Sequence, residues 1–343
     1  MVQILGLILL SFLVISVLLV PFINVLYRIK FQRKIQKTRD IFEERTPIFD
    51  KLHSHKIGTP VGGGVLIIFV VSVLYLAVVN SLPFVGVTQT AVYPIKREIQ
   101  VLLFTFLSFA ALGLYDDLRK TLGLRRAKFW GIRFRWKFLI QWILALIIAS
   151  MLYYSLGIDI VNIRFFDVLN LGIFYIPFAA FTIVSFTNAV NISDGLDGLA
   201  TGLLLICLIA FLVMSRSILD TTLSTFLGLL IGSLIAFLYF NVWPARIWLG
   251  DVGALSFGAT LAVCGLLLGK PIALAVIGGM FVIEVASSLI QLVSKKTRGK
   301  KIFEVAPVHL WLQLKGWEEP KIVFRFWLAG TIFAILGLWL SFF

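Results

Sequence analysis

The chain has 343 residues, of which 60% are hydrophobic, and carries a formal net charge of +14. Soluble domains are usually about 45–50% apolar, so this composition excludes an ordinary soluble domain and predicts an integral membrane protein. Its two cysteines, Cys207 and Cys264, lie in apolar stretches without the spacing of metal ligands, which favours small core residues.

In chain order, ten stretches are apolar enough to cross a bilayer, for which a helix needs about twenty such residues. They cover residues 3–27, 59–79, 98–115, 138–156, 171–190, 198–215, 222–240, 254–269, 271–293 and 323–343. We therefore expect an all-α polytopic membrane protein of about ten transmembrane helices. Residues 1–343 are expected to form a single membrane domain.

The positive charge is distributed very unevenly between the loops. If the loops alternate between two sides, one side holds 26 of the 31 Lys and Arg residues. The other side holds only Lys96, Arg97, Arg164, Arg216 and Lys270. The positive-inside rule places the basic side in the cytoplasm and both termini outside. The charge is thus explained by topology, and nucleic acid is not an expected partner.

The unusual polar segments all fall on that predicted cytoplasmic side. They are Gly58–Gly64, Asp116–Asp117, Asn188–Ala200 (NAVNISDGLDGLA), Asn241–Ala254 and Glu304–Ile322. Because they recur at the same end of successive spans, we expect one site facing the cytoplasm. The glycine run lacks the GK[ST] of a Walker A motif and favours close helix packing.

Several acidic side chains lie in these segments, among them Asp116, Asp117, Asp194, Asp197 and Asp251. Several carboxylates near low dielectric repel one another unless a cation neutralises them. Oxygen ligands without a His or Cys cluster favour Mg²⁺, which commonly takes one or two carboxylates and completes its shell with water and phosphate. Taken singly, each segment could also be a helix cap or span terminator. Glu284, within the ninth span, could be structural or could line the site.

Together these motifs resemble the polyprenyl-phosphate N-acetylhexosamine-1-phosphate transferases, and among them the phospho-N-acetylmuramoyl-pentapeptide transferase family. The resemblance runs from about residue 50 to the end of the chain. It is carried by Lys56–Pro60, Asp116–Asp117, Arg135–Lys137, Asn188–Ala200, the Asn241…Gly250–Asp251 loop, Phe281–Glu284 and Ala306–Lys321.

This resemblance implies transfer of phospho-MurNAc-pentapeptide from UDP to undecaprenyl phosphate, with Mg²⁺, giving lipid I and UMP. It implies a bacterial inner membrane enzyme whose site faces the cytoplasm, and it allows a homodimer. The catalytic residues implied are Asp116, Asp117, Asp251 and His309, with Asp117 and Asp251 as magnesium ligands. The substrate-binding residues implied are Lys56, Lys120, Lys137, Asn191, Asp194, Asp197, Asn241 and Trp248. Asp197 would read the uracil edge, Trp248 would replace the family's usual stacking Phe, and Lys120 and Lys137 would hold phosphates.

One departure leaves the sugar donor open. The family's loop usually reads PxHHH, whereas this chain has Pro307-Val308-His309-Leu310-Trp311. The nearest alternative is a sister transferase that uses UDP-GlcNAc. An ion-coupled transporter is a more distant alternative, but its buried carboxylates would lie near the membrane midplane. Direct attack by the lipid phosphate and a covalent phospho-aspartyl route both stay open.

Overall fold

Long helices account for most of the described chain, which in this computed structural model comprises residues 2–33, 50, 52, 56–81, 84, 88–122, 134–162 and 168–342. The helices that match predicted spans are α1 (Val2–Arg28), α3 (Gly63–Ser81), α4 (Ile95–Leu122), α5 (Phe134–Ser150) with the π-helical turn η3 (Met151–Ser155), α6 (Tyr175–Ser193), α7 (Leu199–Ser217), α8 (Thr221–Asn241), α9 (Gly250–Leu267) and α13 (Glu319–Phe342). Among the described residues, nine helices are long and apolar enough to cross a membrane, or ten if one bent pair counts as a span. The predicted all-α polytopic membrane fold is thereby confirmed.

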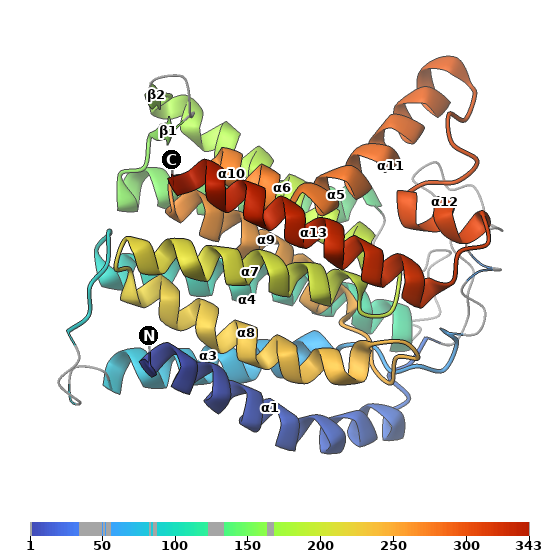
Figure 1. The fold of residues 1–343 in the computed structure, drawn as a ribbon, viewed down its shortest axis with the longest axis horizontal. Coiled ribbons are helices and arrows are strands. Elements are labelled where there is room, and N and C mark those ends of the chain that lie inside the picture. The colour runs from blue at the N-terminus through green and yellow to red at the C-terminus, as the bar shows by residue number, and fades with distance from the viewer. Residues whose placement is uncertain are drawn as a thin grey trace.

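The ninth predicted span is broken rather than continuous. It consists of α10 (Pro271–Ile277) and α11 (Gly279–Arg298), which meet at an angle of 81°. Aromatic rings from other helices pack against two glycines at the break. A Cβ on Gly278 would lie 2.5 Å from the Phe186 ring, and one on Gly279 would lie 2.8 Å from the Phe333 ring. Glycine pairs are common kink sites, and α11 leaves the bundle obliquely as a result (Figure 1).

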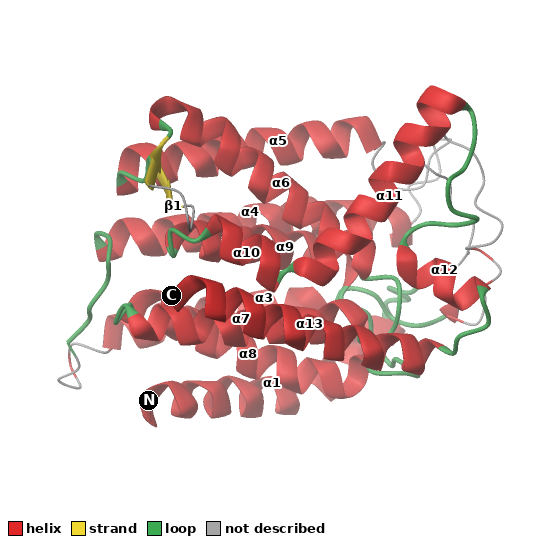
Figure 2. Ribbon diagram, turned by 45° about the horizontal axis from the view of Figure 1, so that its top comes forward, coloured by secondary structure: helices red, strands yellow, loops and turns green. Residues whose placement is uncertain are grey.

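Two short strands accompany the helices at one end of the bundle. Strands β1 (Ile160–Asn162) and β2 (Val168–Asn170) form an antiparallel hairpin, followed by the 3-10 turn η4 (Gly172–Phe174). At the opposite end lies α12 (Val308–Leu314), between α11 and α13 (Figure 2). The basic segments 34–49 and 123–133, together with Arg164, lie outside the described residues.

Helix α9 is the central element, and its small residues let neighbouring backbones approach it. A Cβ on Gly64 of α3 would lie 2.5 Å from the Gly253 backbone, and one on Gly113 of α4 would clash with the Asp251 carbonyl. On the α6 side, a Cβ on Gly258 would lie 2.7 Å from the Phe186 carbonyl oxygen. Small residues allow such packing in membrane helices. The glycine run that opens α3 therefore serves packing, as predicted.

Both chain termini lie at the same end of the bundle, on the left in Figures 1 and 2. The opposite end carries α12 and the starts of α9 and α13. An even number of crossings requires the termini to share a side, as the charge distribution predicts. Their extracytoplasmic placement stays a prediction from the positive-inside rule.

Candidate active site

The first group of site residues gathers where the end of α4 meets the start of α9. Asp116, Asp117 and Lys120 lie on the last two turns of α4, and Asp251 lies on the first turn of α9. Lys137 comes from the first turn of α5. The close approach at Gly113 fixes the two helix ends against each other. This group is called the acid–lysine cluster below.

Two lysines bridge two carboxylates in the acid–lysine cluster. The Lys120 Nζ is 2.9 Å from Asp116 Oδ2 and 2.8 Å from Asp251 Oδ2. The Lys137 Nζ is 3.0 Å from Asp116 Oδ2 and also pairs with Asp251 Oδ2. Asn191, on the last turn of α6, donates from Nδ2 to Asp251 Oδ1 at 3.3 Å. Five predicted site residues from four helices therefore meet through direct contacts.

Asp117 has a separate environment within this cluster. Its side chain is buried, and Oδ2 accepts a hydrogen bond of 3.0 Å from the Val252 backbone N–H. A Cβ on Gly250 would lie 2.7 Å from the same oxygen. The carboxylate thus faces the positive end of the α9 dipole.

Asp194 follows α6 directly and lies partly buried beside the acid–lysine cluster. Burial raises the pKa of its carboxyl well above the ordinary value, and the charges of Asp251 and Asp117 raise it further. Lys56 opposes this shift only in part. A cation arriving at this point would therefore relieve an existing electrostatic cost.

The donor set suits a magnesium ion that shares its shell with phosphate. Among the described residues, no three His, Cys, Asp or Glu side chains converge as a metal-binding group. A phosphate-bridging Mg²⁺ needs only one or two protein carboxylates. Asp117 and Asp251 present carboxylate oxygens at adjoining helix ends, and they stay the predicted ligands.

A second group, called the Lys56 pocket below, contains Lys56, Asp197, Glu319 and Trp248. The Lys56 Nζ is 2.8 Å from Asp197 Oδ1 and 2.5 Å from Glu319 Oε1, and all three side chains are buried. Asp197 Oδ1 also accepts from Trp248 Nε1 at 3.2 Å, and its Oδ2 accepts from the Ala245 N–H at 2.9 Å. These bonds tie the α6–α7 loop to the α8–α9 loop.

Asn241 supports this pocket from within the fold. Its Oδ1 accepts from Thr201 Oγ1 at 2.7 Å, and its Nδ2 donates to the Ile247 carbonyl at 3.0 Å. These bonds anchor the α8–α9 loop, which carries Trp248, to the start of α7. The structure thus gives Asn241 an internal supporting contact, whereas its predicted contact with substrate stays a prediction.

A third group joins Glu284 of α11 to His309 of α12. The His309 ring atom Nδ1 is 2.6 Å from Glu284 Oε2, and the backbone N–H of His309 donates to Glu284 Oε1 at 3.2 Å. Both side chains are buried. A Cβ on Gly195 would lie 2.7 Å from His309 Nε2. Glu284 therefore holds His309 beside the α6–α7 loop. It is hydrogen-bonded within the bundle and also contacts a predicted site residue.

The α6–α7 loop, residues 194–198, connects the three groups. Asn191, just before it, contacts Asp251, and Asp197 contacts Lys56. The Gly195 carbonyl accepts from Lys56 at 3.3 Å, and its Cα faces His309. The predicted site residues thus form one continuous region at one end of the bundle. Glu319 also belongs to it and was missed, since a single Glu before Pro320 at the start of a span looks like an ordinary helix-initiating residue.

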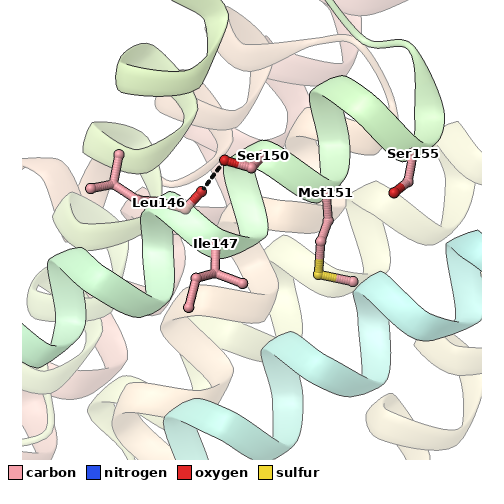
Figure 3. A pocket seen from close by; sticks show the side chains of 5 residues that line it. All are labelled: Leu146, Ile147, Ser150, Met151 and Ser155. Atoms are coloured by element: carbon pink, nitrogen blue, oxygen red, sulfur yellow. Dashed lines mark hydrogen bonds between the residues drawn. The ribbon is translucent and has the colours of Figure 1, made fainter.

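A shallow groove of about 410 Å³ lies elsewhere, at the far end of α5 (Figure 3). Its lining combines Leu146, Ile147 and Met151 with Ser150 and Ser155, and Ser150 Oγ donates to the Leu146 carbonyl at 2.8 Å. The lining residues carry no charge, so this groove is not suited to phosphate chemistry.

The fold and site define a polytopic membrane protein with carboxylates, lysines and a histidine assembled at one end of its helices. Residues 99–269 match the model of glycosyl transferase family 4. The phospho-N-acetylmuramoyl-pentapeptide-transferase of Rickettsia felis is 37% identical over 90% of this chain and 86% of its own length. The enzymes of the same name from Rickettsia montanensis and Rickettsia akari are 36% and 37% identical over the same shares. The chain belongs to the phospho-N-acetylmuramoyl-pentapeptide-transferase family.

Proposed function

We propose that this protein transfers phospho-MurNAc-pentapeptide from UDP-MurNAc-pentapeptide to undecaprenyl phosphate, giving lipid I and UMP, with Mg²⁺ as cofactor. The observation that carries this proposal is the direct connection, through the α6–α7 loop, between the acid–lysine cluster and the Lys56 pocket. The first offers ammonium groups for phosphates, and the second offers an aromatic ring beside hydrogen-bonding groups for a base. The names of the relatives support the same reaction.

The proposed reaction brings an anionic lipid phosphate against a diphosphate, so charge neutralisation and positioning are its main requirements. Lys120 and Lys137 already bridge carboxylates, and their flexible ammonium groups can turn from these oxygens to arriving phosphates. Magnesium, held by Asp117 and Asp251, would supply further neutralisation of the phosphate charge. His309, which Glu284 holds beside Gly195, would contact a substrate group there.

The two substrates would meet at the cytoplasmic face of a bacterial inner membrane. The acceptor's phosphate lies at headgroup depth while its tail stays in the bilayer, and the nucleotide comes from the cytosol. A site at one end of membrane-spanning helices suits this meeting. A homodimer is proposed from the family alone.

A donor competition assay tests this proposal. Purified protein in detergent receives undecaprenyl phosphate, Mg²⁺ and equal amounts of radiolabelled UDP-MurNAc-pentapeptide and UDP-GlcNAc. We expect lipid-linked product from the muramoyl donor with release of UMP. Chelation with EDTA should stop product formation, and added Mg²⁺ should restore it. Product from UDP-GlcNAc alone would refute the muramoyl assignment.

Asp251→Asn and Asp117→Asn are the sharpest substitutions for the same assay. Each keeps the side-chain volume but removes a charge from the acid–lysine cluster. Turnover should fall by more than about 100-fold, a loss typical of removing one group that stabilises charge in a transition state. Glu304→Gln is the matched control, because Glu304 is exposed and pairs only with exposed Lys315 in the described structure. Either aspartate variant retaining over about a tenth of the wild-type rate would mean that the reacting groups lie elsewhere.

A further inference from the structure

Glu319, the first residue of α13, makes more contacts in the Lys56 pocket than an ordinary helix-initiating residue requires. Its side chain is 5% exposed. Oε1 accepts from Lys56 Nζ at 2.5 Å and from the Asp197 backbone N–H at 2.6 Å. Oε2 is buried and has no hydrogen-bond partner among the described residues. The carboxylate therefore reaches from α13 to both members of the Lys56–Asp197 pair.

Lys56 needs Glu319 to keep its present position. Its ammonium group has three donors, and they are matched by Asp197 Oδ1, Glu319 Oε1 and the Gly195 carbonyl. If Glu319 were absent, the ammonium group would lose one partner while Asp197 would lose the acceptor of its N–H. Both groups are buried, so each loss leaves a desolvated polar group unpaired.

Helix α13 is a firm support for this carboxylate. Trp327, two turns beyond Glu319, packs on the start of α7, where a Cβ on Gly202 would clash with its indole ring and one on Gly198 would lie 3.5 Å from it. This contact fixes α13 against the residues that immediately follow Asp197. The distance between Glu319 and the Asp197 N–H is thus set by packed helices rather than by a free loop.

The side chains of the Lys56 pocket also indicate the kind of group it receives. Asp197 and Glu319 both place carboxylate oxygens at the Lys56 ammonium group. Carboxylate oxygens only accept hydrogen bonds when ionised, so they suit a neutral, hydrogen-bond-donating edge such as the imide of uracil better than a phosphate. The phosphates then belong with Lys120 and Lys137 in the acid–lysine cluster.

We propose that Glu319 is a positioning residue for nucleotide binding, acting through Lys56 and the Asp197 backbone. The proposal rests on the proposed function, since it assigns part of the same site. Glu319 fixes the polar edge that receives the base and takes no part in phosphate transfer. Its loss therefore weakens binding of the sugar nucleotide while the transfer step itself continues.

Steady-state kinetics of Glu319→Gln and Glu319→Ala test this role. Glu318→Gln is the matched control, because Glu318 is the exposed neighbour with the same charge. We expect both Glu319 variants to raise the KM for UDP-MurNAc-pentapeptide at least about tenfold, equivalent to about 1.4 kcal/mol. The kcat and the KM for undecaprenyl phosphate should stay within about threefold of wild type, a change of less than 1 kcal/mol. Glu318→Gln should leave all three values unchanged.

Calorimetric titration with UMP gives a second measurement that does not need turnover. The Kd for UMP should rise in parallel with the KM, and adding Glu319→Gln to Lys56→Gln should cost much less than it does alone, because the two side chains act together. An unchanged UMP Kd in Glu319→Gln would overturn the proposal, as would a fall in kcat alone. If Glu319→Ala does not fold, the Kd of Glu319→Gln and Glu319→Asp for UMP provides the test instead. A failure of the proposed function is distinct, since wild type and Glu318→Gln would then form no lipid-linked product.

Discussion

Trp248 combines a flat aromatic face with a hydrogen-bond donor at the edge of the Lys56 pocket. The Arg33 guanidinium lies 5.5 Å from its ring centre, and the Lys56 ammonium lies 5.7 Å away. Its Nε1 donates to Asp197 Oδ1. A phenylalanine would present a similar face without this bond. The indole therefore links the proposed stacking surface to the carboxylate expected to read the base.

Two substitutions separate these properties of Trp248. Trp248→Ala removes the stacking face, which is worth about 1–3 kcal/mol per base in comparable sites, so the Kd for UMP should rise by about 5- to 150-fold. Trp248→Phe keeps a face and frees one acceptor position of Asp197, so UMP should bind at least as tightly as to wild type. Calorimetry with UMP measures both. If Trp248→Phe binds as weakly as Trp248→Ala, the bond to Asp197, rather than stacking, supports the nucleotide.

The raised pKa of Asp194 predicts how stability depends on pH. Between the ordinary range of an aspartate and this raised pKa, the folded carboxyl holds a proton that the unfolded chain has released. Unfolding then releases a proton, so stability falls as pH rises through the folded pKa. Asp194→Asn lacks this effect. Its Tm relative to wild type should therefore increase with pH when both are measured without added metal, and a constant difference from pH 5 to 9 would contradict the assigned shift.

Most residues of the site could be predicted from the sequence because their side-chain chemistry is unusual for membrane spans. Asp116 and Asp251 are charged groups at span ends, whereas Lys120 and Lys137 were implied by the family resemblance. The structure brings all four into direct contact. Glu319 could not be found in this way. Its role depends on how α13 packs against α7, which no local pattern around Pro320 encodes.

At the scale of elements, the position of α9 determines the geometry of the acid–lysine cluster. Gly113 of α4 faces the Asp251 backbone, and Gly64 of α3 faces Gly253 on another side of α9. The N–H groups of Gly63 and Gly64 donate to the carbonyls of Trp248 and Leu249, at 2.8 and 3.0 Å. The same packing that buries α9 therefore holds Asp251 against Asp116 and fixes the loop that carries Trp248.

Gly113→Ala tests whether the geometry of the acid–lysine cluster depends on the packing of α4 against α9. The new methyl group would clash with the Asp251 carbonyl, a backbone atom that cannot rotate away, so α4 and α9 must separate. Overpacking of this kind costs about 1–3 kcal/mol, and Tm should fall accordingly. The kcat should fall as well, because the contacts of Lys120 and Lys137 span both helices. Gly6→Ala is the control, since a Cβ there would meet nothing within 4 Å. If Gly113→Ala kept the Tm and kcat of wild type, α4 and α9 could move apart without cost, and the cluster would not depend on their close packing.

The length of the apolar stretches predicts the transmembrane helices, but it does not predict the break between α10 and α11. Residues 271–293 are mostly apolar, and the Gly278–Gly279 pair permits a kink without requiring one. The division is made by Phe186 and Phe333, which pack on Gly278 and Gly279 from α6 and α13. The bend turns α11 toward α12, where Glu284 meets His309. One part of the site thus depends on a tertiary contact far away in sequence.

At the scale of the whole molecule, orientation in the membrane decides which substrates can reach the site. The termini share one end of the bundle, and the site occupies the other. A nucleotide made in the cytosol can react only if the site end faces inward. The 26 basic residues predicted on that side favour this orientation, since translocating them across the membrane is disfavoured.

Cysteine labelling in intact cells tests the orientation directly. Cys207 and Cys264 are buried, so the unmodified chain should not react with a membrane-impermeant maleimide. Ser81→Cys at the end of α3 and Thr297→Cys near the end of α11 place exposed thiols at opposite ends of the bundle. Both replace a hydroxyl by a thiol, so the two variants control for each other. We expect Ser81→Cys to react from outside the inner membrane and Thr297→Cys to react only after permeabilisation. The reverse pattern would place the acid–lysine cluster on the outer face, where UDP-linked donors are absent, and the proposed reaction would then be excluded.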